Sequence, residues 1–414
     1  MGRMTLCGIH PASRKRYTRR KPLVGPDTPP ERVFIPLELC AGCVPAISTV
    51  KVGERVLVGQ TIAKPGDENG VALHASVSGT VERIETRNSY MGAGKTEFVV
   101  IKNDGEYRLC EDIKPYEKKI TEITCDEVVN LVREAGISGM GGATFPAYAK
   151  IQSAAGKAKE IIVNCAECEP FITANHRLLL EHPMDVISGV KILLIALGLK
   201  KATFAIEDNK KNAAKVLEEL VSDDEMFSVK LLKTKYPQGD ERQIVYALNG
   251  VEIPTGKLPA DVGCVIFNAE TCAAIYHAVV EGMPLIARTV TIDGDCIAEP
   301  KNLRIPLGTS YRDVIEYCGG IKGELSKIIN GGPMMGAAQW DLDATVTKGT
   351  SALLFFSDKY EKKTSPRCIH CGKCVSVCPM HLTPLYLALF SEAGKLDDCL
   401  SYNIMSCMEC GSCS

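Results

Sequence analysis

Residues 159–165 read KEIIVNC, a short apolar run typical of a strand that is buried on both faces of a parallel sheet. A long apolar helix is expected next, over 184–198 (MDVISGVKILLIALG), and then a second apolar strand over 201–209 (KATFAIEDN). A capped helix is indicated before them at 124–136. This alternation of strands and helices predicts a Rossmann-like α/β domain over residues 121–285.

The flanking sequence is organised differently. Residues 36–104 contain short strands broken by glycines at close spacing, which predicts a barrel-sandwich hybrid module. Residues 286–345 have the strand, turn, strand and helix order of a small β-grasp module. After a charged linker, residues 360–414 form a cysteine-rich tail with one helix between its two cysteine motifs. We therefore expect a multidomain α/β protein with a small helical tail.

The composition excludes several classes of protein. The chain carries 48 Lys and Arg against 50 Asp and Glu, a net charge of −2, which does not suggest nucleic-acid binding. No apolar stretch approaches the roughly 20 residues that span a bilayer, and the N-terminus lacks the apolar core of a signal peptide. Nineteen cysteines in a chain without a secretion signal favour metal-bound thiolates over disulfides. We expect a cytoplasmic protein, soluble or peripheral at the cytoplasmic face of the membrane.

Residues 1–35 are predicted to form an irregular basic arm. The first 21 residues contain seven Lys or Arg and no acidic residue. Such a run is usually a solvated, mobile arm. A contact with an acidic partner or an anionic membrane surface is the alternative, and charge alone does not separate the two.

Two cysteine runs carry the clearest chemical signal. Residues 368–379 (CIHCGKCVSVCP) have the spacing C-x2-C-x2-C-x3-C-P, and residues 407–413 (CMECGSC) repeat the first part of it. In two-cluster ferredoxins the fourth cysteine of such a run ligates the other cluster. One [4Fe-4S] cluster is therefore assigned to Cys378, Cys407, Cys410 and Cys413, and a second to Cys368, Cys371 and Cys374.

The second cluster lacks a fourth cysteine, because the sequence stops at Ser414. Either the chain continues beyond this residue, which we expect, or this cluster is incomplete. Zinc is the alternative metal, but zinc sites usually show two separated CxxC pairs, which the present spacing does not match. Cys399 lies off the spacing and is expected to be a buried thiol. His370 is expected to modulate a cluster rather than to bind it.

A glycine-rich loop, GISGMGGATFPAYAK (136–150), follows the first predicted helix. Gly139, Gly141 and Gly142 would allow the backbone to approach a phosphate or a flat ring closely. Lys150 would then neutralise a phosphate. Taken alone, the loop is explained equally well as a tight turn.

Polar side chains lie at the ends of two predicted strands and in one polar loop. Asn164, Glu167 and Glu169 lie just beyond the strand at 159–165, and ligands of open α/β sheets bind at the carboxyl ends of strands. Glu241 belongs to the loop YPQGDERQ, and Asn268 lies at a strand-to-helix junction. Ordinary helix capping is the alternative role for Asn268.

Two further CxxC pairs lie outside the tail. Cys165 and Cys168 have no second pair nearby and are expected to be packing thiols. Cys40 and Cys43, in ELCAGCVP, form either a redox pair or packing thiols.

Several of these motifs, in the same order, resemble the C subunit of the Rnf electron-transport complex. They are GMGGATFPAYAK, NCAECEPFITANHR, YPQGDERQ, LPADVG, NGGPMMG and the paired cysteine runs. This family is similar to the NADH-binding flavoprotein subunit of respiratory complex I, where GRGGAGFP and NADESEP form the flavin and nucleotide site. ELCAGCVP departs from the Rnf pattern and leaves open a soluble electron donor to an amino-acid reductase such as proline reductase.

The resemblance implies that the β-grasp module is SLBB-like and that the chain binds noncovalent FMN and NADH. It assigns FMN to Gly139, Gly141, Gly142, Lys150, Asn164 and the region of Asn268, and NADH to the neighbourhood of Glu167, Glu169 and Glu241. It also implies that NADH is oxidised through FMN and that single electrons pass through [4Fe-4S] clusters to or from other Rnf subunits, ferredoxin or a reductase. No acid–base or nucleophilic catalytic residue is expected, and none of the seven histidines has a catalytic context. A flavin-free iron–sulfur adaptor protein is the alternative of another class.

Overall fold

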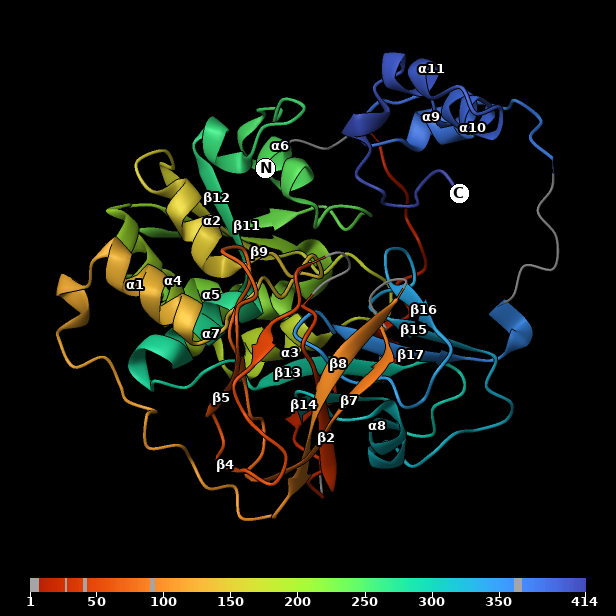
Figure 1. The fold of residues 1–414 in the computed structure, drawn as a ribbon. Helices are drawn as coiled ribbons and strands as arrows, with labels where there is room; N and C mark the ends of the chain where they lie inside the picture. The colour runs from red at the N-terminus through yellow and green to blue at the C-terminus, as the bar shows by residue number, and fades with distance from the viewer. Residues whose placement is uncertain (1–6, 27, 40–42, 90–93, 361–366) are drawn as a thin grey trace.

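The computed structural model describes residues 7–26, 28–39, 43–89, 94–360 and 367–414. Figure 1 shows the chain as an α/β domain next to two groups of β-strands, with the cysteine-rich tail packed at one end. None of the helices in these described ranges combines the length and the hydrophobicity that crossing a bilayer requires.

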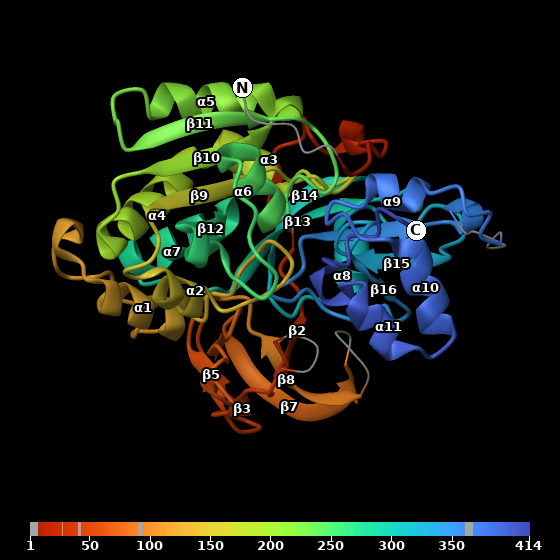
Figure 2. The same ribbon diagram turned by 90° about the horizontal axis from the view of Figure 1, so that it is seen from above.

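The α/β domain is built on a parallel sheet, as predicted. Its strand order is β11 (Phe227–Leu232), β10 (Ala202–Glu207), β9 (Glu160–Cys165) and β12 (Cys264–Asn268). The helices around this sheet, seen from above in Figure 2, are α1 (Cys125–Glu134), α2 (Ala147–Ala154), α3 (Ala174–Glu181), α4 (Pro183–Leu197), α5 (Lys211–Leu220), α6 (Glu241–Asn249) and α7 (Ala269–Val280).

Both faces of this sheet are buried, which explains the continuous apolar runs in the sequence. Side chains alternate along a strand, so Ile161 and Val163 of β9 pack into the large core that includes α4 and α7. Ile162 faces the other way and packs with Ile244 of α6. Helix α1 begins with a capping box in which Thr124 and Glu127 bind each other's backbone N–H groups.

The barrel-sandwich module consists of two small antiparallel sheets. One contains β2 (Arg32–Pro36), β8 (Lys95–Asn103), β7 (Gly79–Asn88) and β4 (Arg55–Val56), and the other contains β3 (Ile47–Ser48), β5 (Thr61–Lys64) and β6 (Leu73–His74). Strand β2 ends at Pro36, so all of it but the last residue lies in the segment 1–35 predicted to be an arm. It belongs to the module because it pairs along its length with β8.

The β-grasp module forms a mixed sheet of six strands. Their order is β1 (Leu23–Val24), β14 (Lys301–Pro306), β13 (Ala287–Asp293), β17 (Ala352–Phe356), β15 (Lys327–Asn330) and β16 (Ala337–Gln339), and α8 (Tyr311–Tyr317) follows β14 in the chain. Strand β17 lies between β13 and β15, so this module continues past the predicted boundary at residue 345.

The prediction of a solvated, mobile arm is wrong where the segment packs on the rest of the protein, at Lys15 and at β1. Lys15 lies in the short 3-10 helix η1 (Lys15–Tyr17) and is buried. Strand β1 adds to the edge of the six-stranded sheet by pairing with β14. Arg16, Arg19 and Arg20 are exposed. The buried ammonium group of Lys15 is compensated by contacts described below.

The tail contains α9 (Lys373–Val377), α10 (Pro384–Glu392) and α11 (Leu396–Ser401). Its small apolar core includes Leu382, Leu387 and Cys399, and the predicted burial of Cys399 is confirmed. The remaining 3-10 helices are η2 (Ile120–Glu122), η3 (Asp208–Lys210), η4 (Pro259–Val262), η5 (Asp358–Tyr360) and η6 (Ile404–Ser406).

Candidate functional site

The glycine-rich loop forms a tight turn between α1 and α2. The backbone N–H of Gly139 donates to the carbonyl of Phe145 at 2.7 Å, and that of Met140 donates to Oγ1 of Thr271 at 3.0 Å. Gly142 has a φ of +115°, a conformation that L side chains rarely adopt, and a Cβ placed there would meet no atom within 4 Å. The tip of the loop is exposed and presents its backbone to open space.

Two asparagines meet at the carboxyl edge of the parallel sheet. Asn164 at the end of β9 lies in register with Asn268 at the end of β12. The side chain of Asn164 donates to the carbonyl of Gly239 at 2.7 Å, and that of Asn268 caps α7 by accepting from the N–H of Glu270 at 2.9 Å. A Cβ on Gly141 would lie 3.8 Å from the Cβ of Asn268. The glycine loop, both strand ends and the YPQGDERQ loop thus share one edge.

Lys150 places a cation at this edge. Its Nζ donates to Oε1 of Glu241 at 2.5 Å and to the carbonyl of Ile266 at 3.1 Å. The side chain of Lys150 is 25% exposed and that of Glu241 is 39% exposed, so the pair is open to solvent and to a ligand. Beside it, Asp240 caps α6, and burial raises the pKa of this carboxyl to about 6.

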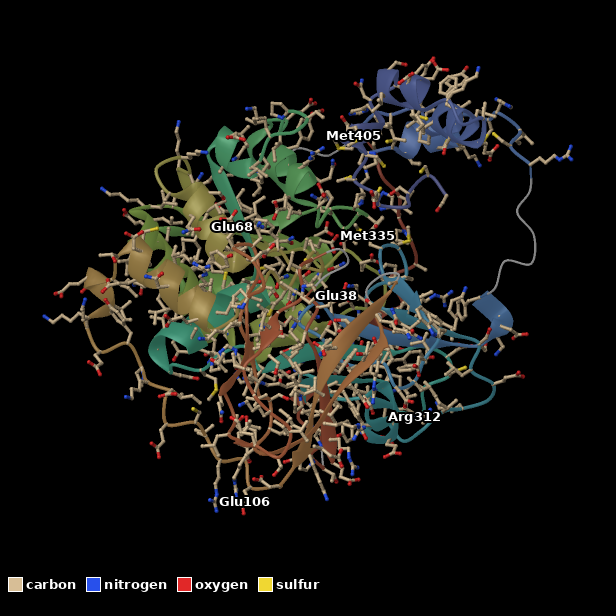
Figure 3. All side chains as sticks on the ribbon, viewed as in Figure 1. Glu38, Glu68, Glu106, Arg312, Met335 and Met405 are labelled. Carbon is tan, nitrogen blue, oxygen red and sulfur yellow. The ribbon has the colours of Figure 1, made fainter. Side chains whose placement is uncertain are left out.

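Glu167 and Glu169 are bound by segments that flank this group. Oε1 of Glu167 accepts from the N–H of Asn175 at 2.8 Å, and Oε2 lies 3.9 Å from Nζ of Lys15. Glu169 accepts from the N–H groups of Met334 and Met335 at 3.1 and 2.9 Å. Met335 lies in the connection between β15 and β16 (Figure 3). Burial raises the pKa of both carboxyls.

Two buried cations behind the glycine loop have no signature in the sequence. Arg288 of β13 donates to the carbonyl of Met140 at 3.2 Å and to Oε2 of Glu270 at 3.1 Å. Nζ of Lys348 donates to the carbonyls of Ala72 and Gly136 at 2.7 and 2.6 Å, and burial lowers its pKa to about 7. Two side chains of the β-grasp module therefore bind the buried side of the glycine loop. Lys348 connects this module to the barrel-sandwich module at Ala72 and to the α/β domain at Gly136.

The two cysteine runs adopt the same local conformation. In the first run His370 and Gly372 have positive φ, and in the second Glu409 and Gly411 do. The N–H of His370 points to Sγ of Cys368 at 3.5 Å, and that of Glu409 points to Sγ of Cys407 at 3.4 Å. Backbone N–H groups directed at cysteine sulfurs are the contacts that stabilise thiolates around iron–sulfur clusters.

One of the predicted cysteine sets lines a single cavity. A cavity of about 360 Å³, mostly apolar, is lined by Cys378, Cys407, Cys410 and Cys413. Burial raises the pKa of the Cys413 thiol, and the other three thiols act electrostatically on it, which reflects their proximity. This donor set and cavity fit a [4Fe-4S] cluster. Among the described residues, no three His, Cys, Asp or Glu side chains lie close enough together to hold a single metal ion.

The remaining cysteines differ from this set. Cys368 and Cys371 are exposed, and neither they nor Cys374 line the cavity. Burial raises the pKa of Cys165 and Cys168 to about 12, so both are neutral thiols near pH 7. Cys43 is disulfide-bonded, and Cys40 lies outside the described residues.

Three protein-family models match the chain. The RnfC barrel-sandwich hybrid domain matches residues 5–106, the Nuo51 FMN-binding domain matches residues 132–277, and the SLBB domain matches residues 289–338. The C subunit of the Na⁺-translocating ferredoxin:NAD⁺ oxidoreductase complex of Acetobacterium woodii is 42% identical over 400 residues, which are 96% of this chain and 89% of that protein. The chain belongs to the RnfC family.

Other members of the RnfC family are also similar to this chain over most of its length. The corresponding protein of the proton-translocating ferredoxin:NAD⁺ oxidoreductase complex of Clostridium ljungdahlii is 42% identical and is covered over 84% of its length, with 93% of this chain. That of the ion-translocating oxidoreductase complex of Vibrio cholerae O395 is 34% identical, over 95% of this chain and 51% of that protein. An NAD⁺-reducing [NiFe]-hydrogenase in its air-oxidized state shares the fold with a TM-score of 0.50 and 19% identity, over 69% of this chain and 55% of that one.

Membership of the RnfC family confirms the resemblance seen in the sequence. It also confirms the multidomain α/β architecture, with barrel-sandwich, FMN-binding and SLBB modules. The match to the FMN-binding domain contains the glycine loop, both strand-end asparagines and the Lys150–Glu241 pair.

Proposed function

We propose that this RnfC chain is an electron-transfer subunit that oxidises NADH at a noncovalent FMN and passes single electrons through [4Fe-4S] clusters to a partner redox protein. One observation carries the proposal. The hydroxyl of Tyr236, two residues before the loop segment Gln238–Gly239–Asp240, donates to the carbonyl of Cys410 at 2.6 Å. One buried side chain thus connects the four-cysteine cavity to the carboxyl edge of the parallel sheet, where the nucleotide is proposed to bind.

The flavin would be held at the carboxyl edge of the sheet. Gly139, Gly141 and Gly142 would bring backbone N–H groups close to it, and Lys150 would supply a positive charge. Asn164 and Asn268 carry amide groups at the strand ends that can hydrogen-bond polar ring atoms. When bound, FMN would supply the exchange between the electron pair of a hydride and single electrons.

Glu167, Glu169 and Glu241 are proposed to shape the NADH side of the site. Glu241 controls how far the charge of Lys150 is available to a ligand, because the two form an ion pair. Glu169 fixes the strand-end loop to the connection between β15 and β16 through two backbone hydrogen bonds. Glu167 anchors the same loop on the side of the N-terminal segment.

Two [4Fe-4S] clusters are proposed in the tail. Cys378, Cys407, Cys410 and Cys413 would ligate one of them, and Cys368, Cys371 and Cys374 would supply three ligands of the other. The shared backbone conformation of the two runs supports equivalent roles. Thiolate ligation and N–H contacts to sulfur set the potential of such clusters.

The partners are proposed to be the other subunits of an Rnf-type complex, together with NAD(H) and ferredoxin. The identity of 42% to two members of such complexes, over nearly their whole length, supports this over a soluble donor to a reductase. The chain would then lie at the cytoplasmic face of the membrane and be held there by its partners.

The test is anaerobic reconstitution of the purified chain with FMN, followed by NADH oxidation with an artificial electron acceptor. We expect about one FMN per chain and turnover that depends on it. A chain that takes up iron and sulfide but neither FMN nor electrons from NADH would instead be the flavin-free adaptor.

A further inference from the structure

The N-terminal segment runs along the junction between the candidate flavin site and the tail. We call residues 8–18 the strap. In Figure 1 this red segment descends beside the tail toward the six-stranded sheet. The N–H of Gly8 donates to the carbonyl of Val377 at 2.8 Å, and Val377 directly precedes Cys378. Ile9 and Tyr236 exchange backbone hydrogen bonds of 2.8 and 2.9 Å, and Tyr236 binds Cys410.

Gly8 allows this close approach. Its φ is +99°, and a Cβ at this position would lie 2.4 Å from the carbonyl oxygen of Tyr236. Side chains do not tolerate such a distance to a backbone atom, so any larger residue must displace the strap from Tyr236. The contact that joins the strap, the loop at Tyr236 and the tail therefore requires that residue 8 has no Cβ atom.

Lys15 fixes the other side of the site. Its buried Nζ donates to the carbonyls of Glu167 and Ile172 at 2.8 and 2.5 Å. The N–H of Phe171 donates to the carbonyl of Ser13 at 2.9 Å. Glu167 and Phe171 both have positive φ, at 47° and 68°, a strained conformation for L residues that persists only where the surrounding structure holds it. The strap supplies part of that support.

Charge balance explains why a lysine can be buried here. Lys15 and Lys210 lie among Glu167 and Glu207, and Nζ of Lys210 donates to Oε2 of Glu207 at 3.1 Å and to the carbonyl of Ala166. Two cations thus offset two anions in an interior where an unpaired charge would be costly.

The C-terminal end of the strap is anchored to the β-grasp module. Oγ1 of Thr173 donates to Oγ1 of Thr18 at 2.8 Å, and the side-chain amide of Asn302 donates to the carbonyl of Thr18 at 3.0 Å. Strand β1 then pairs with β14. The strap is therefore held at both ends and in its middle, each time by a different part of the protein.

We propose that the strap is a positioning element that holds the four-cysteine cavity against the NADH-oxidising site, with Gly8 setting the position of the tail and Lys15 that of the Glu167 loop. This inference rests on the proposed function for its electron-transfer part. Electron transfer between two centres slows as the distance between them grows, so a displaced tail would slow cluster reduction without changing flavin reduction. The arm predicted from its charge to be solvated is thus part of the scaffold of the electron path.

The test compares Gly8→Ala with Gly25→Ala, since a Cβ on Gly25 meets no atom within 4 Å. It also compares Lys15→Met with Arg20→Met, since Arg20 lies two residues beyond the strap and is exposed. Three quantities are measured on the anaerobic holoprotein: the rate of flavin reduction by NADH, the rate at which the cluster EPR signal appears after freeze-quenching, and amide hydrogen exchange in the tail.

For Gly8→Ala we expect flavin reduction that matches wild type, cluster reduction slowed several-fold, and faster amide hydrogen exchange in the tail. Lys15→Met should instead raise the KM for NADH several-fold. Both control variants should match wild type. Unchanged cluster reduction in Gly8→Ala, or a tail that exchanges as slowly as in wild type, would overturn the inference. If NADH does not reduce wild-type protein, the proposed function fails, while the exchange data still decide whether the strap holds the tail.

Discussion

Replacing Lys150 by methionine separates ligand binding from folding at the candidate flavin site. Methionine keeps the length and apolar stem of the side chain and removes the ammonium group. The structure gives that group two partners, Oε1 of Glu241 at 2.5 Å and the carbonyl of Ile266 at 3.1 Å. It leaves one N–H of the ammonium group for a bound anion.

The two expected effects differ in size. Because the Lys150–Glu241 pair is partly exposed, its loss should lower the free energy of unfolding by no more than about 1 kcal/mol. A charge-assisted hydrogen bond to FMN contributes about 1.5–3 kcal/mol, so FMN affinity should fall by about 10- to 150-fold. Glu241, left without its cation, would add repulsion toward a phosphate, and Glu241→Gln in the same chain should restore part of the loss.

The assay is a titration of apoprotein with FMN, followed by flavin fluorescence, together with urea unfolding of the same samples. Lys157→Met is the matched control, because Lys157 is exposed shortly after the same helix. FMN binding by Lys150→Met that equals wild type would refute the placement of a phosphate beside Lys150. A loss of stability well above 1 kcal/mol would show that the pair has a structural role instead.

Three further predictions follow from the buried groups. Cys410→Ser should abolish one [4Fe-4S] EPR signal and leave the FMN content unchanged, because Tyr236 binds the backbone carbonyl and not the thiol; loss of flavin together with the cluster would contradict this. Arg288→Met leaves the buried carboxylate of Glu270 without its cation and should lower the free energy of unfolding, measured in urea, by about 3–5 kcal/mol. Arg312→Met, on the exposed face of α8 (Figure 3), should change it by less than about 1 kcal/mol. Burial lowers the folded-state pKa of Lys348 from 10.5 to about 7. Between these pH values the unfolded chain binds more protons than the folded chain, so the free energy of unfolding should rise with pH. Lys348→Met should remove up to about 1.4 kcal/mol per pH unit of that slope, and an unchanged slope would show that Lys348 does not cause it.

Local patterns were sufficient for four elements of the α/β domain, namely α1, β9, α4 and β10. The apolar runs at 159–165 and 201–209 became β9 and β10 because both faces of the sheet are buried, and a strand buried on both faces shows no alternation. The cysteine spacing likewise grouped Cys378 with the second run across nearly 30 intervening residues, because the rule for two-cluster ferredoxins is itself a spacing rule.

Contacts between distant segments could not be predicted from local patterns. Nothing near Lys15 in the sequence distinguishes it from the exposed arginines beside it, since its burial depends on carbonyls of Glu167 and Ile172, more than 150 residues away. The same is true of Glu169, whose partners are backbone N–H groups of Met334 and Met335. Strand β17 was assigned outside the β-grasp module because its place between β13 and β15 depends on sheet order and not on its own sequence.

The proposed function requires that an NADH-reducible flavin exchanges electrons with a cluster held by Cys378, Cys407, Cys410 and Cys413. A pair of visible and EPR spectra of the anaerobic, FMN-loaded protein, recorded before and after NADH, tests this exchange in one sample. We predict that NADH bleaches the flavin band and produces a [4Fe-4S] EPR signal that is missing from Cys410→Ser. A protein that binds zinc in place of iron, or whose flavin is reduced while the clusters stay oxidised at every NADH concentration, would contradict the proposed function.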